Sequence, residues 1–435
     1  MSEALRIGLA GLGTVGAAVF RLLTEKAEHV ADRTGRPIRV VGVCARDRSR
    51  DRGIDLSGVA WYDDPVALAG ADDVDVFVEL IGGEGDPAAA AVRAALSAGI
   101  PVVTANKALL AASGIELARL AEENGATIGY EAAVAGGIPI IKTMREAIAG
   151  NRVSRVYGIL NGTCNYILTQ MEQEGLGFAE CLAEAQRLGY AEADPTFDIE
   201  GNDSAHKLAL LTALAFGTEI DTDSIHLEGI SSITPEDIEA AAELGYRIKL
   251  LGVARRTDTG IEQRVTPTMV PRTLAMAEIH GVLNAVAVDG DEVGEIMLVG
   301  PGAGSTATAS AVVGDVMDIA RGGVCPPIFG VPVGKLQPYK PARMRAHEGG
   351  YYIRLSVYDR PGAFAAIAQR MAEQSISLES IMQKDLRDPD NPEQVRRVVL
   401  ITHETTEAQI RRALSAIMDD KQIEGRPQMI RIEMP

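Results

Sequence analysis

Cysteine is scarce in this sequence, and the cysteines form no recognisable framework. Cys44, Cys164, Cys181 and Cys325 are far apart in a chain of 435 residues and show neither C-x-x-C nor zinc-ligand spacing. This pattern excludes a disulfide-stapled scaffold and gives no sign of a zinc site. We therefore expect a reducing compartment and a cytoplasmic location.

A surplus of basic residues and long apolar runs are also absent. The chain has 42 Lys and Arg against 60 Asp and Glu, a formal charge of −18 at pH 7, and this charge repels phosphate backbones and anionic lipids. No apolar run approaches the ~18 residues of a membrane-spanning helix. The opening residues include Glu3 and no basic segment, so a signal peptide is unsupported. We expect neither nucleic acid nor a membrane as a partner.

Apolar residues are plentiful, at 46% of the chain, which is enough for two or three domains that each bury a core. In the first third, short β-branched runs alternate with alanine-rich amphipathic stretches, a pattern typical of βα units around a parallel sheet. Strands are expected to begin at residues 6, 38, 74, 101 and 126, with helices over 86–98 and 109–123. The fold class is α/β, with a Rossmann-like doubly wound domain.

The middle of the chain has a different pattern, from about residue 152 onward. Helices are expected over 166–174 and 178–188. Short alternating runs over 261–268, 283–288 and 295–299 predict an open sheet, backed by helices over 203–216 and 235–244. After residue 300, a glycine turn leads into a helix that can return to the first domain. The prediction is an α+β substrate and dimerisation domain.

The last part of the chain comes after a stretch rich in Pro and Gly, which marks a linker. Beyond it the pattern predicts βαββαβ, a ferredoxin-like order. The expected boundaries are 1–137, completed by 301–322, for dinucleotide binding; 138–300 for substrate and catalysis; 323–349 for the linker; and 350–435 for the tail. We expect few contacts across the linker, so the tail should be a separable regulator.

A glycine-rich motif comes directly after the first predicted strand and opens a helix. It consists of Gly11, Leu12, Gly13, Thr14, Val15 and Gly16. Its glycines permit a tight turn, close backbone approach to a pyrophosphate and close helix–strand packing, while the helix N-terminus supplies free N–H groups. A bare motif of this kind also occurs in other tight turns. Because the flanking strand and helix and the next strand are all expected here, we predict dinucleotide binding.

The residue expected to contact the ribose favours NADP. In NAD-preferring sites an acid usually ends the second strand, but this chain has Arg46 there, with Arg48 nearby. A guanidinium pairs with a 2′-phosphate in a bidentate, charge-assisted way. A solvated basic loop is the plainer explanation, and Asp47 leaves NAD as the alternative.

Four further strings resemble one family. They are TANKALL from Thr104, NGTCNYIL from Asn161, GYAEADPTFDIEGNDSAHKLALL from Gly189, and DRPG from Asp359. Together they resemble homoserine dehydrogenase with a C-terminal ACT domain, over nearly the whole chain. The resemblance implies interconversion of L-homoserine and L-aspartate 4-semialdehyde with a nicotinamide cofactor, in the branch leading to threonine and methionine.

Aldehyde reduction needs a proton for oxygen as well as a hydride for carbon, so the protein must supply an acid. Asp203 and Lys207 are four residues apart in a predicted helix and therefore share a face. An isolated pair of this kind is more often a surface ion pair. The resemblance instead implies that Lys207 donates the proton and that Asp203 orients substrate or a bridging water.

The resemblance assigns further roles around this pair. It implies that Lys107, in the loop after the fourth predicted strand, serves the hydride site, with Thr104 and the turn 79–83 beside the nicotinamide. Glu192 and Asp198 match the family's substrate-binding acids, and a buried substrate ammonium needs such a partner. Acidic loops of this kind are otherwise commonly just hydrated. Gly304 matches a residue that lines the cofactor cleft.

A cation and an effector are also implied. By spacing alone, EAAVAGGIP from Glu131 is a strand-to-helix turn. The resemblance implies a monovalent cation there, with sodium as the expected ion, held by Glu131 and the backbone carbonyls of Val134, Gly136 and Ile138. It further implies an amino-acid effector at the tail, with L-threonine as the pathway-level expectation, and a homodimer or homotetramer. The DRPG string is otherwise an ordinary turn.

Two other interpretations compete with this one. A different dehydrogenase with the same two domain types, of the prephenate or phosphoglycerate kind, leaves the Gly189 string unexplained. A non-catalytic amino-acid sensor would be favoured by a broken glycine loop or missing lysines, and both are intact in this chain.

Overall fold

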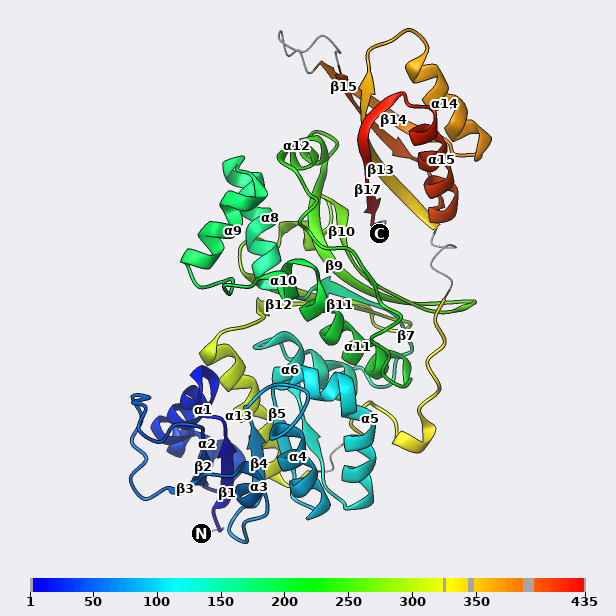
Figure 1. Cartoon of the computed structure of the whole chain (residues 1–435). Coiled ribbons are helices and arrows are strands. Elements are labelled where there is room, and N and C mark those ends of the chain that lie inside the picture. The colour runs from blue at the N-terminus through cyan, green and yellow to red at the C-terminus, as the bar shows by residue number, and fades with distance from the viewer. Residues whose placement is uncertain (1–2, 324–325, 343–347, 386–394, 434–435) are drawn as a thin grey trace.

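The computed structural model describes residues 3–323, 326–342, 348–385 and 395–433. Cys325 and the parts 324–325 and 343–347 of the expected linker lie outside the described residues. The molecule is elongated, with the N-terminal sheet at one end, a larger sheet in the middle and the C-terminal unit at the other end (Figure 1).

The first sheet consists of six parallel strands in the order β3-β2-β1-β4-β5-β6. They are β1 (Leu5–Ala10), β2 (Ile38–Cys44), β3 (Ala60–Tyr62), β4 (Val76–Glu79), β5 (Val102–Thr104) and β6 (Ile128–Gly129). This order places the switch between the two halves of the sheet at β1 and β4, where doubly wound folds bind dinucleotides. The prediction of a Rossmann-like sheet is confirmed. The short β3 was not predicted.

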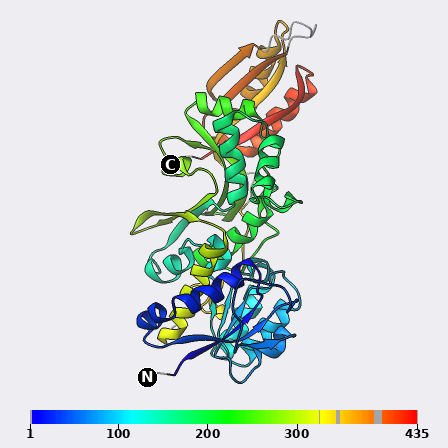
Figure 2. The same cartoon turned by 90° about the vertical axis from the view of Figure 1, so that its left-hand side faces the viewer.

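Helices cover both faces of this sheet. They are α1 (Thr14–Glu25), α2 (Ala27–Thr34), α3 (Pro65–Ala69), α4 (Ala88–Ser97), α5 (Lys107–Glu123) and α13 (Ser305–Arg321). α3, α4 and α5 pack in sequence on one another, whereas α13 packs against α1 and α2. Figure 2 shows α13, in yellow, beside the blue α1. The segment that begins at residue 305 thus completes the helical layer formed by α1 and α2. Small buried residues of α13, such as Ala309, allow the helices to approach closely.

The middle sheet is built on a long antiparallel hairpin, β9 (Tyr246–Thr257) and β10 (Gly260–Pro271). β7 (Val153–Ile159), β11 (Leu283–Gly290) and β12 (Gly294–Pro301) extend it on the β9 side, and the short β8 (His226–Leu227) pairs with β10. The helical segments of this region are α6 (Glu131–Ala135), α7 (Ile140–Lys142), the π-helical turn η1 (Thr143–Ala147), α8 (Gly162–Glu174), α9 (Phe178–Arg187), α10 (Thr196–Ile199), α11 (Asn202–Phe216), α12 (Pro235–Glu243) and the 3₁₀ turn η2 (Ala275–Glu278). The sequence did not predict β9.

The C-terminal unit, residues 348–433, has the predicted βαββαβ order. Its elements are β13 (Glu348–Tyr358), α14 (Ala363–Glu373), β14 (Leu378–Asp385), β15 (Val395–Thr402), the short β16 (Thr405–Thr406), α15 (Glu407–Asp419) and β17 (Ile423–Ile432). The strands lie in the order β17-β13-β15-β14, a ferredoxin-like arrangement. Apolar residues of β13, α14 and α15, such as Ile353, Ile367 and Ile410, form a core of their own.

The expectation of few contacts between tail and catalytic part is wrong. β17 pairs in parallel with β10, Thr268 opposite Arg431, so the middle and C-terminal sheets form one sheet of eleven strands. The described part of the linker also packs, since Val333, in the 3₁₀ turn η3 (Val333–Lys335), is buried and its N–H donates to Glu122. Pro and Gly break regular structure, but the apolar residues between them still gain by burial.

Candidate active site

A cleft of about 660 Å³ lies at the carboxyl ends of the first strands, lined in part by Gly11, Gly13 and Arg46. Gly11 has φ +96°, a conformation that glycine adopts freely. A Cβ on Gly16 would lie 1.9 Å from the carbonyl oxygen of Gly11, so only glycine permits this close turn. Thr14 is the exposed first residue of α1. The motif therefore has the geometry that brings backbone N–H groups to a phosphate.

Several guanidinium groups surround the far end of this cleft. Arg50 and Arg52 line it beside Arg46, although the sequence-based prediction named only Arg46 and Arg48. Arg52 donates to the carbonyl oxygen of Leu12 at 3.1 Å, so it ties the basic loop to the glycine turn. Arg48 instead lies over the Trp61 ring, 5.8 Å from its centroid. The density of arginines in this loop was the sequence signal for the two that were missed.

Thr104 is buried, and its hydroxyl donates to Glu79 Oε2 at 2.6 Å. The other oxygen of Glu79 accepts the N–H groups of Ile81 and Gly82 at 2.8 and 3.0 Å. Thr104 and Glu79 therefore fix the 79–83 turn from behind, and Ile81 and Gly82 line the cleft. The hydroxyl of Thr104 is committed to this scaffold and does not face the cleft.

A second cleft, of about 590 Å³, separates the first sheet from the middle sheet. It brings together Val15, Lys107, Gly304, Asp203 and Lys207, which are up to 289 residues apart in sequence. Gly304, at φ +109°, precedes α13 and faces Val15 of α1 across this opening. The second cleft therefore joins the predicted catalytic residues to three of the predicted cofactor residues, Val15, Lys107 and Gly304, while Gly11, Gly13 and Arg46 line the first cleft.

Asp203 lies between two lysines. Its Oδ2 is 2.7 Å from Lys207 Nζ, and its Oδ1 is 3.1 Å from Lys107 Nζ. Lys207 Nζ also donates to the Leu160 carbonyl oxygen at 2.7 Å, and Lys107 is the first residue of α5 rather than a loop residue. Burial alone raises the pKa of Asp203, but the two ammonium groups outweigh it and hold that pKa below its ordinary value. Asp203 is thus shared by two ammonium groups, and these favour a nearby oxygen that develops negative charge.

Asn161, which the sequence-based prediction did not single out, organises the acids of the site. Its Nδ2 donates to Asp198 Oδ1 at 2.8 Å and to Asp203 Oδ2 at 2.9 Å, while its Oδ1 caps α8 by accepting from Cys164 N–H. An Asn just before a predicted helix is an N-cap signal, and the NGTC string carries it. One amide therefore sets the positions of both carboxylates.

The two predicted substrate acids differ in environment. Glu192 is exposed and lines the second cleft. Asp198 also lines it but is partly buried, and burial raises its pKa although the Asn161 hydrogen bond opposes this. Glu192 is thus accessible to a charged ligand, whereas Asp198 belongs to the hydrogen-bonded frame of the catalytic cluster.

Glu131 is buried at the start of α6, and its carboxylate oxygens accept the N–H groups of Ile141 and Lys142 at 2.8 and 2.9 Å. Burial raises the pKa of this carboxyl to about 7. Val134 and Gly136 line the cleft close by, and the Ile138 carbonyl oxygen accepts the Ile140 N–H. Lys142 directs its ammonium to Asp315 and Asp318 instead. Both oxygens of the Glu131 carboxylate are thus engaged by backbone N–H groups in this structure.

A third cleft, of about 860 Å³, lies elsewhere, between η1 and the ends of α11 and β9. It contains none of the predicted site residues. In the described ranges, no group of three or more His, Cys, Asp and Glu side chains is arranged to hold a metal ion. No helix among the described residues is long and apolar enough to span a membrane.

Family models match three consecutive parts of the chain. The homoserine dehydrogenase NAD-binding domain matches residues 11–131, the homoserine dehydrogenase domain residues 139–317, and the ACT domain residues 351–421. The first two contain the glycine loop and the lysine cluster. The third lies within the βαββαβ unit and ends before β17.

Whole-chain comparisons agree. The homoserine dehydrogenase of Neisseria gonorrhoeae is 46% identical, over 99% of this chain and 98% of its own. That of Pseudomonas aeruginosa is 43% identical, over 99% of this chain and 99% of its own. The crystal structure of a homoserine dehydrogenase from Thiobacillus denitrificans has a TM-score of 0.92 at 42% identity, covering 99% of this chain and 98% of that one. A hyperthermophilic archaeal homoserine dehydrogenase in complex with NADPH has a TM-score of 0.61 at 26% identity over 74% of this chain and 99% of its own. The chain therefore belongs to the homoserine dehydrogenase family and carries a nicotinamide-nucleotide-binding domain and a C-terminal ACT domain.

Proposed function

We propose that the NAD(P)-dependent interconversion of L-homoserine and L-aspartate 4-semialdehyde by this chain is carried by Lys207, Asp203 and Lys107. The supporting observation is the position of Asp203 between two lysine ammonium groups at one side of a cleft. The nicotinamide, when bound, supplies or accepts the hydride. The protein must then provide the proton and stabilise the charge on the substrate oxygen.

Lys207 is the proton donor in this proposal. Two of its three ammonium protons are engaged by Asp203 and the Leu160 carbonyl, which fixes Nζ and leaves one N–H for the substrate oxygen. Lys107 is more exposed, at 30% of its side chain, and adds positive charge from the nucleotide side of the cleft. Asp203 holds both ammonium groups in place on this side of the cleft.

Glu192 and Asp198 have separate roles. Glu192 faces the cleft and binds the substrate ammonium, which otherwise loses its hydration without compensation. Asp198 shares the Asn161 amide with Asp203 and keeps the cluster in register. This division is based on their difference in exposure.

NADP is the preferred cofactor, with NAD as the alternative. Arg46, Arg50 and Arg52 line the first cleft beyond the end of β2, where an NAD site usually has an acid. Asp47 also lines it, but its carboxylate accepts hydrogen bonds from the amide and hydroxyl of Ser49. Three guanidinium groups match the added charge of a 2′-phosphate.

A monovalent cation, most simply sodium, is held at Glu131 with the carbonyls of Val134, Gly136 and Ile138. Its role is structural, because the proton chemistry is already assigned to Lys207. Replacing sodium by tetramethylammonium at equal ionic strength should lower the melting temperature of the protein. An unchanged Tm, together with unchanged activity, would refute the cation site.

The ACT domain binds an amino acid, with L-threonine as the candidate, and the enzyme is a homodimer or homotetramer. Exposed apolar side chains on this domain, Phe364, Ile381 and Met418, supply surface for self-association. Asp359 of the DRPG turn pairs with Arg396 at 2.7 Å, which fixes the turn before α14. A cytoplasmic location stays a prediction from the cysteine content.

The decisive experiment monitors nicotinamide absorbance with L-homoserine and either NADP or NAD, in protein shown to be folded and supplied with sodium. We expect turnover with both and a higher kcat/KM with NADP. A higher kcat/KM with NAD would overturn the cofactor preference, and no turnover with either would overturn the assignment of the site. Light scattering with and without L-threonine gives the oligomeric state and its response to the effector.

A further inference from the structure

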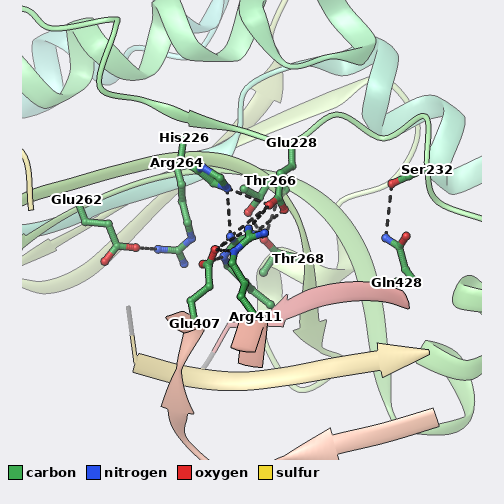
Figure 3. Close-up of polar contacts among 11 residues, drawn as sticks. His226, Glu228, Ser232, Glu262, Arg264, Thr266, Thr268, Glu407, Arg411 and Gln428 are labelled. Atoms are coloured by element: carbon green, nitrogen blue, oxygen red, sulfur yellow. Dashed lines mark hydrogen bonds and ion pairs between the residues drawn. The ribbon is translucent and has the colours of Figure 1, made fainter. Parts of the chain in front are cut away.

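The segment 226–230 connects the ACT domain to the catalytic helix α11. On one side, Arg431 of β17 donates to Glu228 Oε2 at 2.7 Å, and His226 Nε2 is 2.9 Å from Glu228 Oε1. On the other side, the N–H of Ile230 donates to the carbonyl oxygen of Ile199, at the end of α10. Figure 3 shows Glu228, His226, Glu407 and Arg411 converging where β10 meets the C-terminal strands.

The backbone of this segment packs directly against the backbone at the end of α10. A Cβ on Gly229 would lie 2.5 Å from the Ile199 carbonyl oxygen and 2.8 Å from Glu200 Cα, so the two backbones are at closest approach. Ser231 Oγ also donates to Glu200 Oε1 at 2.8 Å. A shift of residues 226–230 is therefore passed directly to residues 199–200.

Residues 199–200 lead straight into the catalytic cluster. Gly201 caps α11 at φ +89°, its N–H donates to the Asp198 carbonyl oxygen, and its own carbonyl accepts from Ala205. Val265 of β10 packs on the other side of Gly201, since a Cβ on Gly201 would lie 3.0 Å from Val265 Cγ1. The carbonyl oxygen of Val265 also accepts the Glu228 N–H. Asp203 comes two residues after this clamped turn.

The outer end of the segment is fixed by buried charge. Arg431 is fully buried, and its guanidinium joins two carboxylates, Glu228 on the catalytic side and Glu407 of α15. Without Arg431, Glu228 and Glu407 would rely on Arg411, which is 53% exposed and lies 2.7 Å from Glu407 but 3.4 Å from Glu228. Removing the buried partner therefore leaves the charge of Glu228 less well compensated, and that charge moves toward solvent. Glu228 would then draw residues 226–230 away from α10.

We infer that Arg431 and Glu228 are positioning residues for proton transfer, acting through residues 226–230 and 199–201 on Asp203 and Lys207. The ACT domain thus contributes to the basal reaction through its last strand, apart from any effector. The inference rests on the proposed roles of Asp203 and Lys207.

The test uses the full-length chain with Arg431→Met, which keeps much of the side-chain volume and removes the charge. We expect kcat to fall roughly tenfold or more, since small misplacements of catalytic groups are costly. A fluorescence titration with NADPH gives both the Kd and the number of folded sites. The Kd should stay unchanged, because the residues that line the two clefts belong to other elements than β17. Arg431→Lys should recover part of kcat.

Arg370→Met is the matched control. Arg370 lies in the same domain and binds Asp420 at 2.8 Å through two nitrogens, and it also binds Glu373, so these contacts stay within α14 and the residue after α15. We expect Arg370→Met to lower the Tm without lowering kcat per folded site. If Arg431→Met does not fold, Glu228→Ala becomes the deciding variant. We again expect a lower kcat and an unchanged Kd for NADPH.

Two results would overturn the inference. One is wild-type kcat per folded site in the deciding variant. The other is a parallel loss of kcat and NADPH affinity, which indicates general damage to the structure. Failure of the proposed chemistry is distinguished by Lys207→Ala, because that variant alters the cluster itself and leaves the junction intact.

Discussion

Two buried charge clusters of this molecule are built from the same kinds of side chain and serve different ends. At the active site, two lysines share one aspartate, and Lys107 keeps 30% of its side chain exposed to the cleft. At the junction with the ACT domain, Arg431 is fully buried between Glu228 and Glu407. The first cluster is open, because it lines the second cleft, and the second is closed, because Arg431, Glu228 and Glu407 line none of the three clefts described above, although Glu228 keeps 30% of its side chain exposed.

This difference explains why one cluster can do chemistry and the other holds structure. A cluster that lines a cleft can meet a substrate oxygen and lose a proton to it. The junction cluster lines none of these clefts, and its buried arginine must find its partners within the protein. The position of each cluster relative to a cleft, more than the residue types, separates the two functions.

The largest effect is expected at the open cluster. Lys207→Ala should lower kcat by on the order of 10² or more, because a positioned general acid contributes about 10²–10⁴. NADPH affinity should barely change, since Lys207 is held by Asp203 and Leu160. Steady-state kinetics with L-homoserine and a fluorescence titration check both points. A near-normal kcat would reduce the pair to a structural ion pair.

The arginines beside the glycine turn form a third, fully open group, and their removal should alter cofactor choice. Arg46→Glu should weaken NADP about ten- to a hundredfold, since a charge-assisted hydrogen bond is worth roughly 1.5–3 kcal/mol. NAD binding should change little. Kd values for both cofactors provide the measurement, and equal losses would place Arg46 outside the phosphate site. Arg48→Glu is the matched control, because Arg48, unlike Arg46, is not among the residues that line the first cleft.

Removal of the ACT domain tests the closed cluster by taking away Arg431 and Glu407 together. We expect a chain ending at Ala342 to lose its response to L-threonine, to melt at a lower temperature and to lose several-fold in kcat, because β10 loses β17 and Glu228 loses Arg431. Initial rates with and without L-threonine, together with Tm, are the measurements. Full kcat in the shortened chain would restore the sequence-based view of a separable tail, and retained inhibition would place the effector elsewhere.

The smallest effect is expected at Lys249, a buried lysine whose Nζ donates to Asn165 and to the Ile279 carbonyl rather than to a carboxylate. Burial lowers its pKa to about 8, against about 10.4 in an unfolded chain. Between these values the unfolded state binds more protons, so this group's contribution to stability rises with pH. From about pH 7.5 to 9.5, the Tm of the wild type should gain on the order of 1–3 °C over that of Lys249→Met. Parallel Tm curves would contradict the shift.

Much of the fold was predictable because its signals are local. The βα alternation, the glycine turn and the βαββαβ order all arise from periodicity and turn residues over short stretches. β9 was missed because its sequence, YRIKLLGVARRT, mixes charged and apolar residues without strict alternation, and β9 is buried over most of its length. Its polar positions are satisfied by distant partners, such as Asn165 for Lys249.

The site was predictable in part for the same reason. Lys207 and Asp203 share a helix face, and Asn161 had its N-cap signal, but the meeting of Asp203 with Lys107 depends on how two sheets pack. The junction was unpredictable from spacing, since Thr268 and Arg431 pair across 163 positions of sequence. The Pro and Gly content of the linker indicated irregular backbone correctly, but it carries no information on the strand pairing of the domain beyond it.

The position of β17 has a consequence for synthesis. This strand is the last that the structure describes, yet it lies inside the eleven-stranded sheet, between β10 and β13. Residues 423–432 must leave the ribosome before β10 gains this neighbour, and until then β10 presents unpaired backbone groups that invite pairing with another molecule. Slow assembly of this seam would make the nascent enzyme dependent on protection from aggregation.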